Sequence, residues 1–453
     1  MSGNKVRLFW EGRQDTPSGI AHSVEPAVIS RIYPHPVKPE NSLWPEEIRR
    51  PDATPENRMC FGDNSDVMQY LLRNGYENRF NLIYIDPPYL SNQKYLSRIE
   101  IGDKTSPQPV ERQVFRDNGP GGLDAFLEQM FLRLQLMKDL LNENGSLFVH
   151  LDWHVSHYAK VLLDEIFGSQ TMINEIVWCY GGGTGTRRHF HRKHDLILWY
   201  AKGPDYTFNP QYRSYSPGTV QRGLTRVKGD RYKLHSKGAL MQDWWSDINK
   251  ILSPTAHENL KFPTQKPLAL LERIIAAASN PGDLVGDFYA GSATAAQACE
   301  ASGRFWVTCD NSPIAIDTAM KRLIRMPARP FTVESMEASS HETGKLVLKP
   351  LLVNDFSSED ILLQVGIQSY RPGQEIKPAP AFSYIDFWEI DLNYDGKVFN
   401  SDLQVVRASQ RMDSDLPLQI TARLKKPSTP IEIAIRVHDV FGDTVVAIAR
   451  LNS

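Results

Sequence analysis

The sequence predicts an α/β protein: a mostly parallel sheet covered by helices, with one inserted segment, followed by a smaller β-sandwich. Short apolar runs such as 82–85 alternate with amphipathic stretches such as 122–141, which is typical of the strands and helices of parallel sheets. Along 431–438 apolar and polar residues instead alternate one by one, and turn signals such as Asp395-Gly396 accompany this part. The change of pattern divides the chain near residue 330.

Composition indicates an ordinary globular protein. The chain has 453 residues, too many for one hydrophobic core, which predicts about two or three domains. Hydrophobic residues make up 41% and charged residues 23%, and no apolar run reaches the length of a membrane span. The N-terminal residues lack the apolar core of a signal peptide, so we expect a cytoplasmic protein without a membrane partner.

Patterns typical of metal ligands are weak. Cys60, Cys179, Cys299 and Cys309 show no C-x-x-C spacing, and they predict neither a zinc site nor a disulfide framework. Three histidines between residues 150 and 157 could share a helix face. No carboxylate or cysteine completes a set of metal ligands, so we expect no metal. Burial beside Trp153 or contact with a substrate is the favoured role for these histidines, which are His150, His154 and His157.

Composition along the chain sets the expected domain boundaries. Residues 1–57 are rich in proline and weakly periodic, and we expect an irregular N-terminal arm that lies on the core. Residues 58–330 form the main domain, with an inserted segment at 181–262. Residues 331–453 form the C-terminal β-sandwich, in which we find no cluster of catalytic residue types.

The first half of the main domain begins with a strand at 59–63. It ends at Asp63, which is a candidate polar contact to a ligand, with a helix N-cap as the alternative role. Residues 95–121 have no clear period, and we interpret them as a mobile flap. The other elements expected here are a helix at 122–141, a strand at 146–151, a helix at 155–167 and strands at 173–178 and 196–200.

The strand at 82–85 runs into Asp86-Pro87-Pro88-Tyr89. Each proline lacks an N–H, so a stiff loop lies just past the carboxyl end of the strand, where open α/β sheets place their ligands. Asp86 and the Pro87 carbonyl could together accept both N–H bonds of the exocyclic amine of a nucleobase, and Tyr89 could stack on the base. Taken alone, the tetrapeptide is equally compatible with an ordinary turn.

A second strand end lies at Asp287. After the strand at 284–287, the loop 287–294 is rich in small residues and leads into a helix, which brings backbone N–H groups near a nucleotide-like ligand. The next strand, 305–309, ends at Asp310, whose carboxylate could accept both ribose hydroxyls of such a ligand. Helices at 268–279, entered by Pro267, and at 314–326 complete the domain.

Positive charge gathers in the inserted segment, although the whole chain has a net charge of −2. Residues 181–240 contain 12 Lys or Arg against 3 Asp or Glu, whereas 331–453 contain 12 against 17. Aromatic residues are interleaved with the basic ones, which suits phosphate contacts and base stacking; a solvated loop is the alternative. The candidates for phosphate contact are Arg187, Arg188, Arg192, Lys193, Arg222 and Arg226.

With the loops 86–89 and 287–294 both present, the chain resembles the S-adenosylmethionine-dependent DNA amino-methyltransferases. It is most similar to their permuted β group, in which the catalytic loop precedes the cofactor loop. The resemblance covers about residues 59–326 and implies a Rossmann-like methyltransferase sheet. The other matching segments are Gly62-Asp63-Asn64, 147–154, 194–202, Thr264-Gln265-Lys266-Pro267 and 304–310.

The resemblance implies a role for each loop. Asp86, Pro87, Pro88 and Tyr89 would form the catalytic loop. The residues that would hold S-adenosylmethionine are Asp63, Lys266, Pro267, Asp287, Tyr289, Ala290, Gly291, Ser292, Thr294 and Asp310. The family's cofactor loop usually reads D-P-F-x-G-S-G-T, but here Phe288, Tyr289 and Ala293 replace Pro, Phe and the second Gly. A Cβ at position 293 weakens cofactor binding if the backbone there needs a positive φ.

The implied activity is site-specific methylation of duplex DNA, in which the enzyme flips one adenine and methylates its N6. One alternative is cytosine N4, although family members of that kind more often carry Ser where Asp86 stands. The other alternative, motivated by Phe288 and Ala293, is a catalytically weak DNA-binding subunit of a modification complex. Duplex DNA is the expected partner, and a homodimer or a restriction-modification partner subunit is left open.

Overall fold

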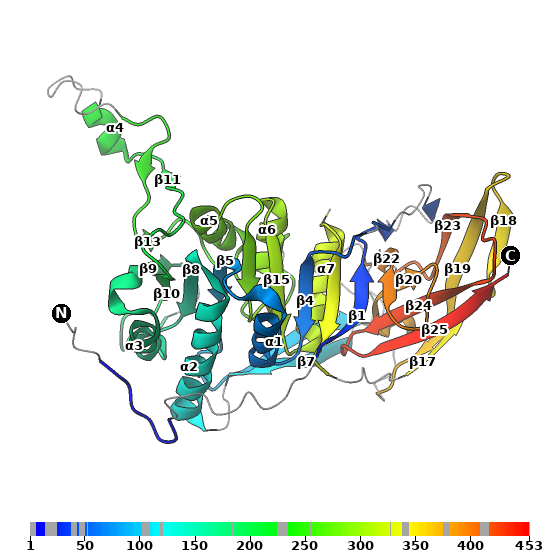
Figure 1. The fold of residues 1–453 in the computed structure, drawn as a ribbon, viewed down its shortest axis with the longest axis horizontal. Helices are drawn as coiled ribbons and strands as arrows, with labels where there is room; N and C mark the ends of the chain where they lie inside the picture. Colours follow the sequence, from blue (N-terminus) through cyan, green and yellow to red (C-terminus); the bar gives the residue numbers. More distant parts are fainter. Residues whose placement is uncertain are drawn as a thin grey trace.

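The computed structural model describes residues 6–13, 25–37, 43–44, 50–51, 53–101, 108–117, 121–182, 185–223, 234–253, 256–326, 328–337, 344–374, 381–407 and 416–452. A large sheet with helices on both faces forms the middle of the molecule, and two smaller sheets lie at one end (Figure 1). A narrow arm with β11 (Tyr212–Arg213) and α4 (Pro217–Gly223) projects near the other end. No helix within the described residues is long and apolar enough to cross a membrane.

The large sheet has 11 strands and a parallel centre. Its strands are, in order, β13 (Trp244–Trp245), β9 (Met172–Cys179), β10 (His194–Ala201), β8 (Leu141–Leu151), β5 (Phe80–Ile85), β14 (Leu284–Asp287), β15 (Phe305–Asp310), β4 (Asn57–Phe61), β16 (Phe331–Ser335), β1 (Ala27–Ile32) and β21 (Phe399–Ser401). From β8 to β16 every neighbouring pair is parallel, whereas β10 is antiparallel to both of its neighbours.

Two hydrophobic cores cover the two faces of this sheet. Leu82 and Tyr84 of β5 belong to one core, and Ile83 and Ile85 belong to the other, because successive side chains of a strand point to opposite faces. The first core contains α5 (Leu268–Ala278), α6 (Thr294–Ala301) and α7 (Pro313–Arg325), and the second contains α1 (Asn64–Leu71), α2 (Gly122–Leu140) and α3 (Ser156–Phe167). Burial on both faces explains the continuous apolar run, and the predicted α/β fold is confirmed.

The parallel strands bring four acidic residues to one edge of the sheet. Asp287 and Asp310 are the last residues of β14 and β15, and Asp86 directly follows β5. Asp63 lies two residues beyond β4, the next strand of the sheet. Since the carboxyl ends of parallel strands meet at the same edge, this is where a ligand site is expected.

The C-terminal part contains the predicted β-sandwich. One sheet has β17 (Lys345–Leu348), β18 (Leu352–Asp355), β19 (Asp360–Arg371), β23 (Gln419–Lys425) and β3 (Leu43–Trp44), and the other has β2 (Pro36–Val37), β22 (Leu403–Val406), β20 (Ile385–Asp391), β24 (Ile431–Asp439) and β25 (Thr444–Leu451). Leu363 from the first sheet and Trp388 from the second are fully buried in one shared core.

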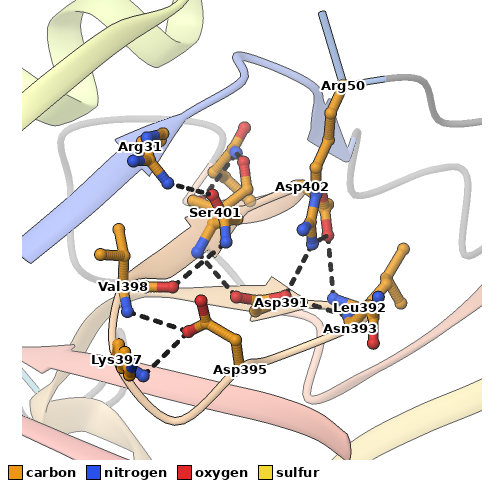
Figure 2. A network of polar contacts seen from close by, with 12 residues as sticks. Arg31, Arg50, Asp391, Leu392, Asn393, Asp395, Lys397, Val398, Ser401 and Asp402 are labelled. Carbon is orange, nitrogen blue, oxygen red and sulfur yellow. Dashed lines mark hydrogen bonds and ion pairs between the residues drawn. The ribbon is translucent and has the colours of Figure 1, made fainter. Parts of the chain in front are cut away.

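The N-terminal segment differs from the expected irregular arm. β1 joins the large sheet, while β2 and β3 each add a strand to one sheet of the sandwich. The guanidinium of Arg50 strengthens this connection through ion pairs of 2.7 Å with Asp391 and 2.6 Å with Asp402 (Figure 2). The strands were not predicted because the segment is rich in proline, which disfavours strands. Pro36 is nevertheless compatible with β2, because this strand lies at a sheet edge.

The expected flap and the inserted segment also contain regular structure. The flap includes a hairpin of β6 (Lys94–Ile101) and β7 (Gln108–Arg116), whose mixed polar sequence gives only a weak alternation. Within 181–262, β10 and β13 belong to the large sheet. The projecting arm contains β11 and α4 (Figure 1), and β12 (Ala239–Leu240) pairs with β11. Beyond residue 330, β16 and β21 belong to the large sheet rather than to the sandwich.

Candidate active site

A cavity at the carboxyl edge of the central strands encloses about 860 Å³ of empty space, part of which is open to solvent. Its walls are the loop after β5, the segment 262–266 before α5 and the loop after β14. The structure therefore places the two loops that were singled out in the sequence at the same cavity. Lining residues that are not among the predicted site residues include Tyr95, Val114, Phe115, Asp117, Phe262, Gln265 and Asn311.

Asp86 faces this cavity with both carboxylate oxygens engaged. One accepts a hydrogen bond from the Tyr89 hydroxyl, and the other forms an ion pair with the ammonium of Lys266. That ammonium lies 5.7 Å from the centroid of the Tyr89 ring. Burial raises the pKa of Tyr89 well above its usual value, and the Asp86 carboxylate adds to this, so the phenol remains a donor. A carboxylate has about four acceptor sites, which leaves capacity for the N–H of a ligand.

His150 contacts Tyr84, which precedes the catalytic-loop candidate, and Tyr89, which is its last residue. Its Nδ1 is 2.9 Å from the Tyr84 hydroxyl, and its ring stacks on Tyr89 with centroids 6.5 Å apart. Its Nε2 is 3.4 Å from Asp195, which also accepts a hydrogen bond of 2.9 Å from Tyr180. The histidine is fully buried, and the described residues contain no group of three metal-ligand side chains. His150 therefore supports the loop through its contacts with Tyr84 and Tyr89.

The loop after β14 makes a tight turn into α6. Gly291 and Ala293 both adopt left-handed conformations, with φ of 49° and 54°. A Cβ at Gly291 would lie 3.1 Å from the ring of Phe262, which also lines the cavity. Glycine therefore leaves space between this loop and Phe262. A residue with a Cβ is disfavoured in this conformation by about 1 kcal/mol or more. Ala293 therefore occupies the kind of position at which the family's glycine is useful.

The carboxyl groups of Asp287, which is buried, and of Asp310, which is partly buried, hold this turn. Asp287 accepts the Tyr289 N–H at 3.1 Å, and burial raises the pKa of Asp287 to about 8. Asp310 accepts the N–H groups of Gly291 at 2.8 Å and Ser312 at 2.9 Å, and burial also raises its pKa. Asp310 thus fixes the loop and at the same time lines the cavity.

Arg322 of α7 is a functional candidate that the sequence reasoning missed. Its Nη1 donates to the Ser292 carbonyl at 2.8 Å and to the Thr294 hydroxyl at 2.7 Å. Burial lowers the pKa of Arg322 to about 10, so the guanidinium remains charged at neutral pH. No clear signal for this role exists in the sequence, because α7 carries three further charged residues, Asp317, Lys321 and Arg325. Its contacts explain how both hydroxyl-bearing residues are held at the cavity.

Two of the expected cofactor residues do not line this cavity. Asp63 lies at a neighbouring one, which shares residues such as Pro87 and Tyr289 with the first. Its carboxylate accepts the Ser65 N–H at 2.8 Å and pairs with Arg133 at 2.9 Å, so the N-cap role is confirmed. Pro267 immediately precedes α5 and lines neither cavity.

Four of the six basic candidates lie on the loop between β9 and β10, at the same edge of the large sheet as Asp86. Arg187 and Arg188 are exposed, and the guanidinium of Arg192 lies 4.0 Å from the centroid of the Trp153 ring. Lys193 donates to the Gly182 carbonyl at the base of the loop. The side chain of Arg222 and all of Arg226 lie outside the described residues.

These features define an α/β ligand-binding domain in which an acidic loop and a glycine-containing loop open into one cavity. The model of the N6/N4 DNA methylase family matches residues 80–321, which include both loops and Lys266. The chain belongs to this DNA methylase family. The predicted methyltransferase resemblance is thereby confirmed, and the cofactor that this family implies is S-adenosylmethionine.

Individual relatives match the chain over similar lengths. It is 26% identical to the type II methyltransferase M.EcaI of Enterobacter cloacae, over 59% of this chain and 69% of the relative. It is 27% identical to the DNA adenine methyltransferase YhdJ of Escherichia coli K12, over 54% and 76%. Among solved structures, the complex of M1.HpyAVI with S-adenosylmethionine aligns at 20% identity with a TM-score of 0.39, covering 59% of this chain and 98% of the other.

The cavity has features that suit S-adenosylmethionine. Gly291 leaves room that a Cβ would fill, and the first turn of α6 begins directly beyond it. The Asp310 carboxylate offers an acceptor for ribose hydroxyls, and Asp287 lines the same cavity. The residues present therefore fit the cofactor, and Ala293 strains the turn without filling the cavity.

Proposed function

We propose that the protein is a site-specific DNA methyltransferase that methylates N6 of an adenine flipped out of duplex DNA. The observation that carries the proposal is that Asp86 lines the same cavity as the 287–294 loop. The same cavity thus contains an acceptor for the amine and the candidate cofactor residues. The adenine-specific name of the relative YhdJ agrees with an acidic residue at the start of the catalytic loop.

The loop after β14 holds the cofactor in this proposal. Gly291, Ser292 and Thr294 contact it from the start of α6, and Asp310 binds the ribose hydroxyls. When bound, S-adenosylmethionine supplies a methyl group on a sulfonium that is open to nucleophilic attack. Arg322 keeps the hydroxyls of Ser292 and Thr294 in place, because its Nη1 donates to them at 3.2 Å and 2.7 Å.

Asp86, Pro87 and Tyr89 act on the flipped base. The carboxylate and the Pro87 carbonyl would accept the two N–H bonds of the amine and so orient its nitrogen, and Tyr89 would stack on the ring. The carboxylate of Asp86 would stabilise the positive charge that develops on this nitrogen during methylation. Asp86 can then accept the proton that the nitrogen loses.

Duplex DNA binds through the basic loop between β9 and β10, which lies at the same edge of the sheet. Flipping is required because the amine is inaccessible within the paired and stacked duplex. The chain is also 25% identical to the Mod subunit of the type III restriction-modification enzyme StyLTI of Salmonella typhimurium, over 49% of that relative. This likeness supports a restriction-modification context, in which a second copy or a partner subunit could assemble with the chain.

The experiment is methylation of plasmid DNA with labelled S-adenosylmethionine, followed by mass spectrometry of the digested product and sequencing of the modified positions. N6-methyladenine at a fixed sequence is the expected result. N4-methylcytosine without N6-methyladenine would overturn the substrate assignment. DNA binding without cofactor binding in a calorimetric titration would instead favour the non-catalytic alternative.

A further inference from the structure

The chain directly after the catalytic loop is strained. Leu90 and Asn92 both have a φ of 58°, in the left-handed region. Asn tolerates this conformation comparatively well, whereas Leu does not, because its Cβ approaches the following carbonyl and its side chain offers no compensating hydrogen bond. Backbone strain of this kind persists only where surrounding contacts hold it. The position matters because Leu90 is the next residue after Tyr89.

Asp117 supplies those contacts. One carboxylate oxygen accepts the Leu90 N–H at 3.0 Å, and the other accepts the Ser91 N–H at 2.8 Å together with the Ser91 hydroxyl. The backbone N–H of Asp117 donates to the Gln93 carbonyl at 3.1 Å. The residue is only 1% exposed, so water does not compete effectively for these bonds. One buried carboxylate therefore fixes the strained turn.

The hairpin that precedes Asp117 is itself held on both sides. Near the cavity, the rings of Tyr95 and Phe115 stack with centroids 4.6 Å apart. At the opposite end, Ile101 and Val110 are buried in the core of the C-terminal sandwich. Between them, Arg112 donates to the Val440 carbonyl of the sandwich at 2.9 Å. Asp117 thus has a rigid support that reaches from the sandwich to the cavity.

We propose that Asp117 is a positioning residue for the methyl transfer, and that the β6–β7 hairpin links the C-terminal sandwich to the catalytic loop. Because Asp117 holds Leu90 and Ser91, it fixes the position of the backbone that directly follows Tyr89. The fixed backbone in turn maintains the orientation in which the Tyr89 hydroxyl donates to Asp86. The inference rests on the proposed function, because it assigns Asp117 to the orientation of the same loop. It also gives the sandwich a role in catalysis.

The test compares Asp117→Asn and Asp117→Ala with the wild type in steady-state methylation kinetics, in titration with S-adenosylmethionine and in hydrogen exchange of residues 86–93. Loss of hydrogen bonds to a buried carboxylate predicts that kcat falls about 10- to 100-fold, with Asp117→Asn the milder variant. The Kd for the cofactor should stay within about 3-fold, since catalysis and not binding is affected. The Leu90 and Ser91 amides should exchange faster.

Asp360→Asn is the matched control, because its carboxylate pairs with Arg423 in the sandwich far from the cavity. It should change neither kcat nor exchange at 86–93. Unchanged kcat in both Asp117 variants would overturn the proposal, and so would a lowered kcat with unchanged exchange at 86–93. If Asp117→Ala does not fold, Asp117→Asn and Ser91→Ala, which removes one hydroxyl contact, decide the matter. Absence of methylation by the wild type would refute the proposed function instead.

Discussion

Lys266 and Asp86 are 180 positions apart in the sequence and form an ion pair in the cavity. The lysine comes from the segment before α5, and the aspartate comes from the loop after β5. Both side chains are largely buried, with exposed fractions of 12% and 16%. The pair joins the cofactor side of the cavity to the candidate catalytic loop, and it holds the carboxylate near the place where the amine would enter.

Asp86→Ala should remove most turnover while the fold, cofactor binding and DNA binding persist. The variant loses the acceptor for the amine and leaves Lys266 without its partner. The general scale for a positioned acid or base group predicts a fall of at least roughly 100-fold. Single-turnover methylation measures the effect, with calorimetry for S-adenosylmethionine binding and a gel-shift assay for DNA. Near-normal turnover would remove Asp86 from the mechanism.

Ala293→Gly should bind S-adenosylmethionine at least as tightly as the wild type. Ala293 has a φ of 54°, and glycine adopts this conformation without the steric penalty of a Cβ. Relief of the strain should also raise the free energy of unfolding by about 1 kcal/mol. Ala298→Gly, at an equally buried position inside α6, is the matched control and should destabilise by a similar amount. Weaker cofactor binding by Ala293→Gly would show that alanine suits this turn.

Replacement of Arg187, Arg188, Arg192 and Lys193 with alanine should weaken DNA binding and flatten its salt dependence. Each lost phosphate contact reduces the slope of log K against log salt by up to roughly 0.9. Fluorescence anisotropy at several salt concentrations measures this slope. The control replaces four exposed basic residues of the sandwich, which are Lys345, Lys349, Arg371 and Lys397. Equal slopes in the loop variant and the wild type would exclude the loop from the interface.

Asp287→Asn should stabilise the protein increasingly as the pH rises from about 4 to about 8. Burial raises the pKa of Asp287 to about 8, above the unfolded value of about 4. Between these values the folded protein holds a proton that the unfolded chain has released, so the wild-type free energy of unfolding falls with rising pH. The difference should reach at least about 1 kcal/mol at pH 8.

Urea denaturation without cofactor at several pH values measures this difference. Asparagine is neutral throughout and its side-chain oxygen can still accept the Tyr289 N–H, so the variant should lack the pH-dependent loss. Asp395→Asn is the control at an exposed turn, where backbone N–H groups lower the pKa of the carboxyl, and it should gain no stability as the pH rises. A difference between Asp287→Asn and the wild type that does not vary with pH would contradict the prediction.

Several site residues could be predicted because their signals are local. Asp86 follows a run that is apolar enough to be buried on both faces, and Asp287 and Asp310 end two further strands. The hairpin β6–β7 was harder to predict, since its strands are stabilised by contacts with the sandwich and with 261–262 rather than by a regular alternation. The strands β1–β3 were also not predicted, because distant strands supply their hydrogen bonds.

The sequence by itself determined the fold class, the two loops and the edge of the sheet where they meet. Strand periodicity and proline placement are local properties, and parallel strands necessarily bring their carboxyl ends together. Only the tertiary structure decided which side chains hold those loops: Lys266 on Asp86, Arg322 on Ser292 and Thr294, and Asp117 on Leu90 and Ser91. Such partners depend on how distant segments pack, and charge and spacing along the chain do not encode that choice.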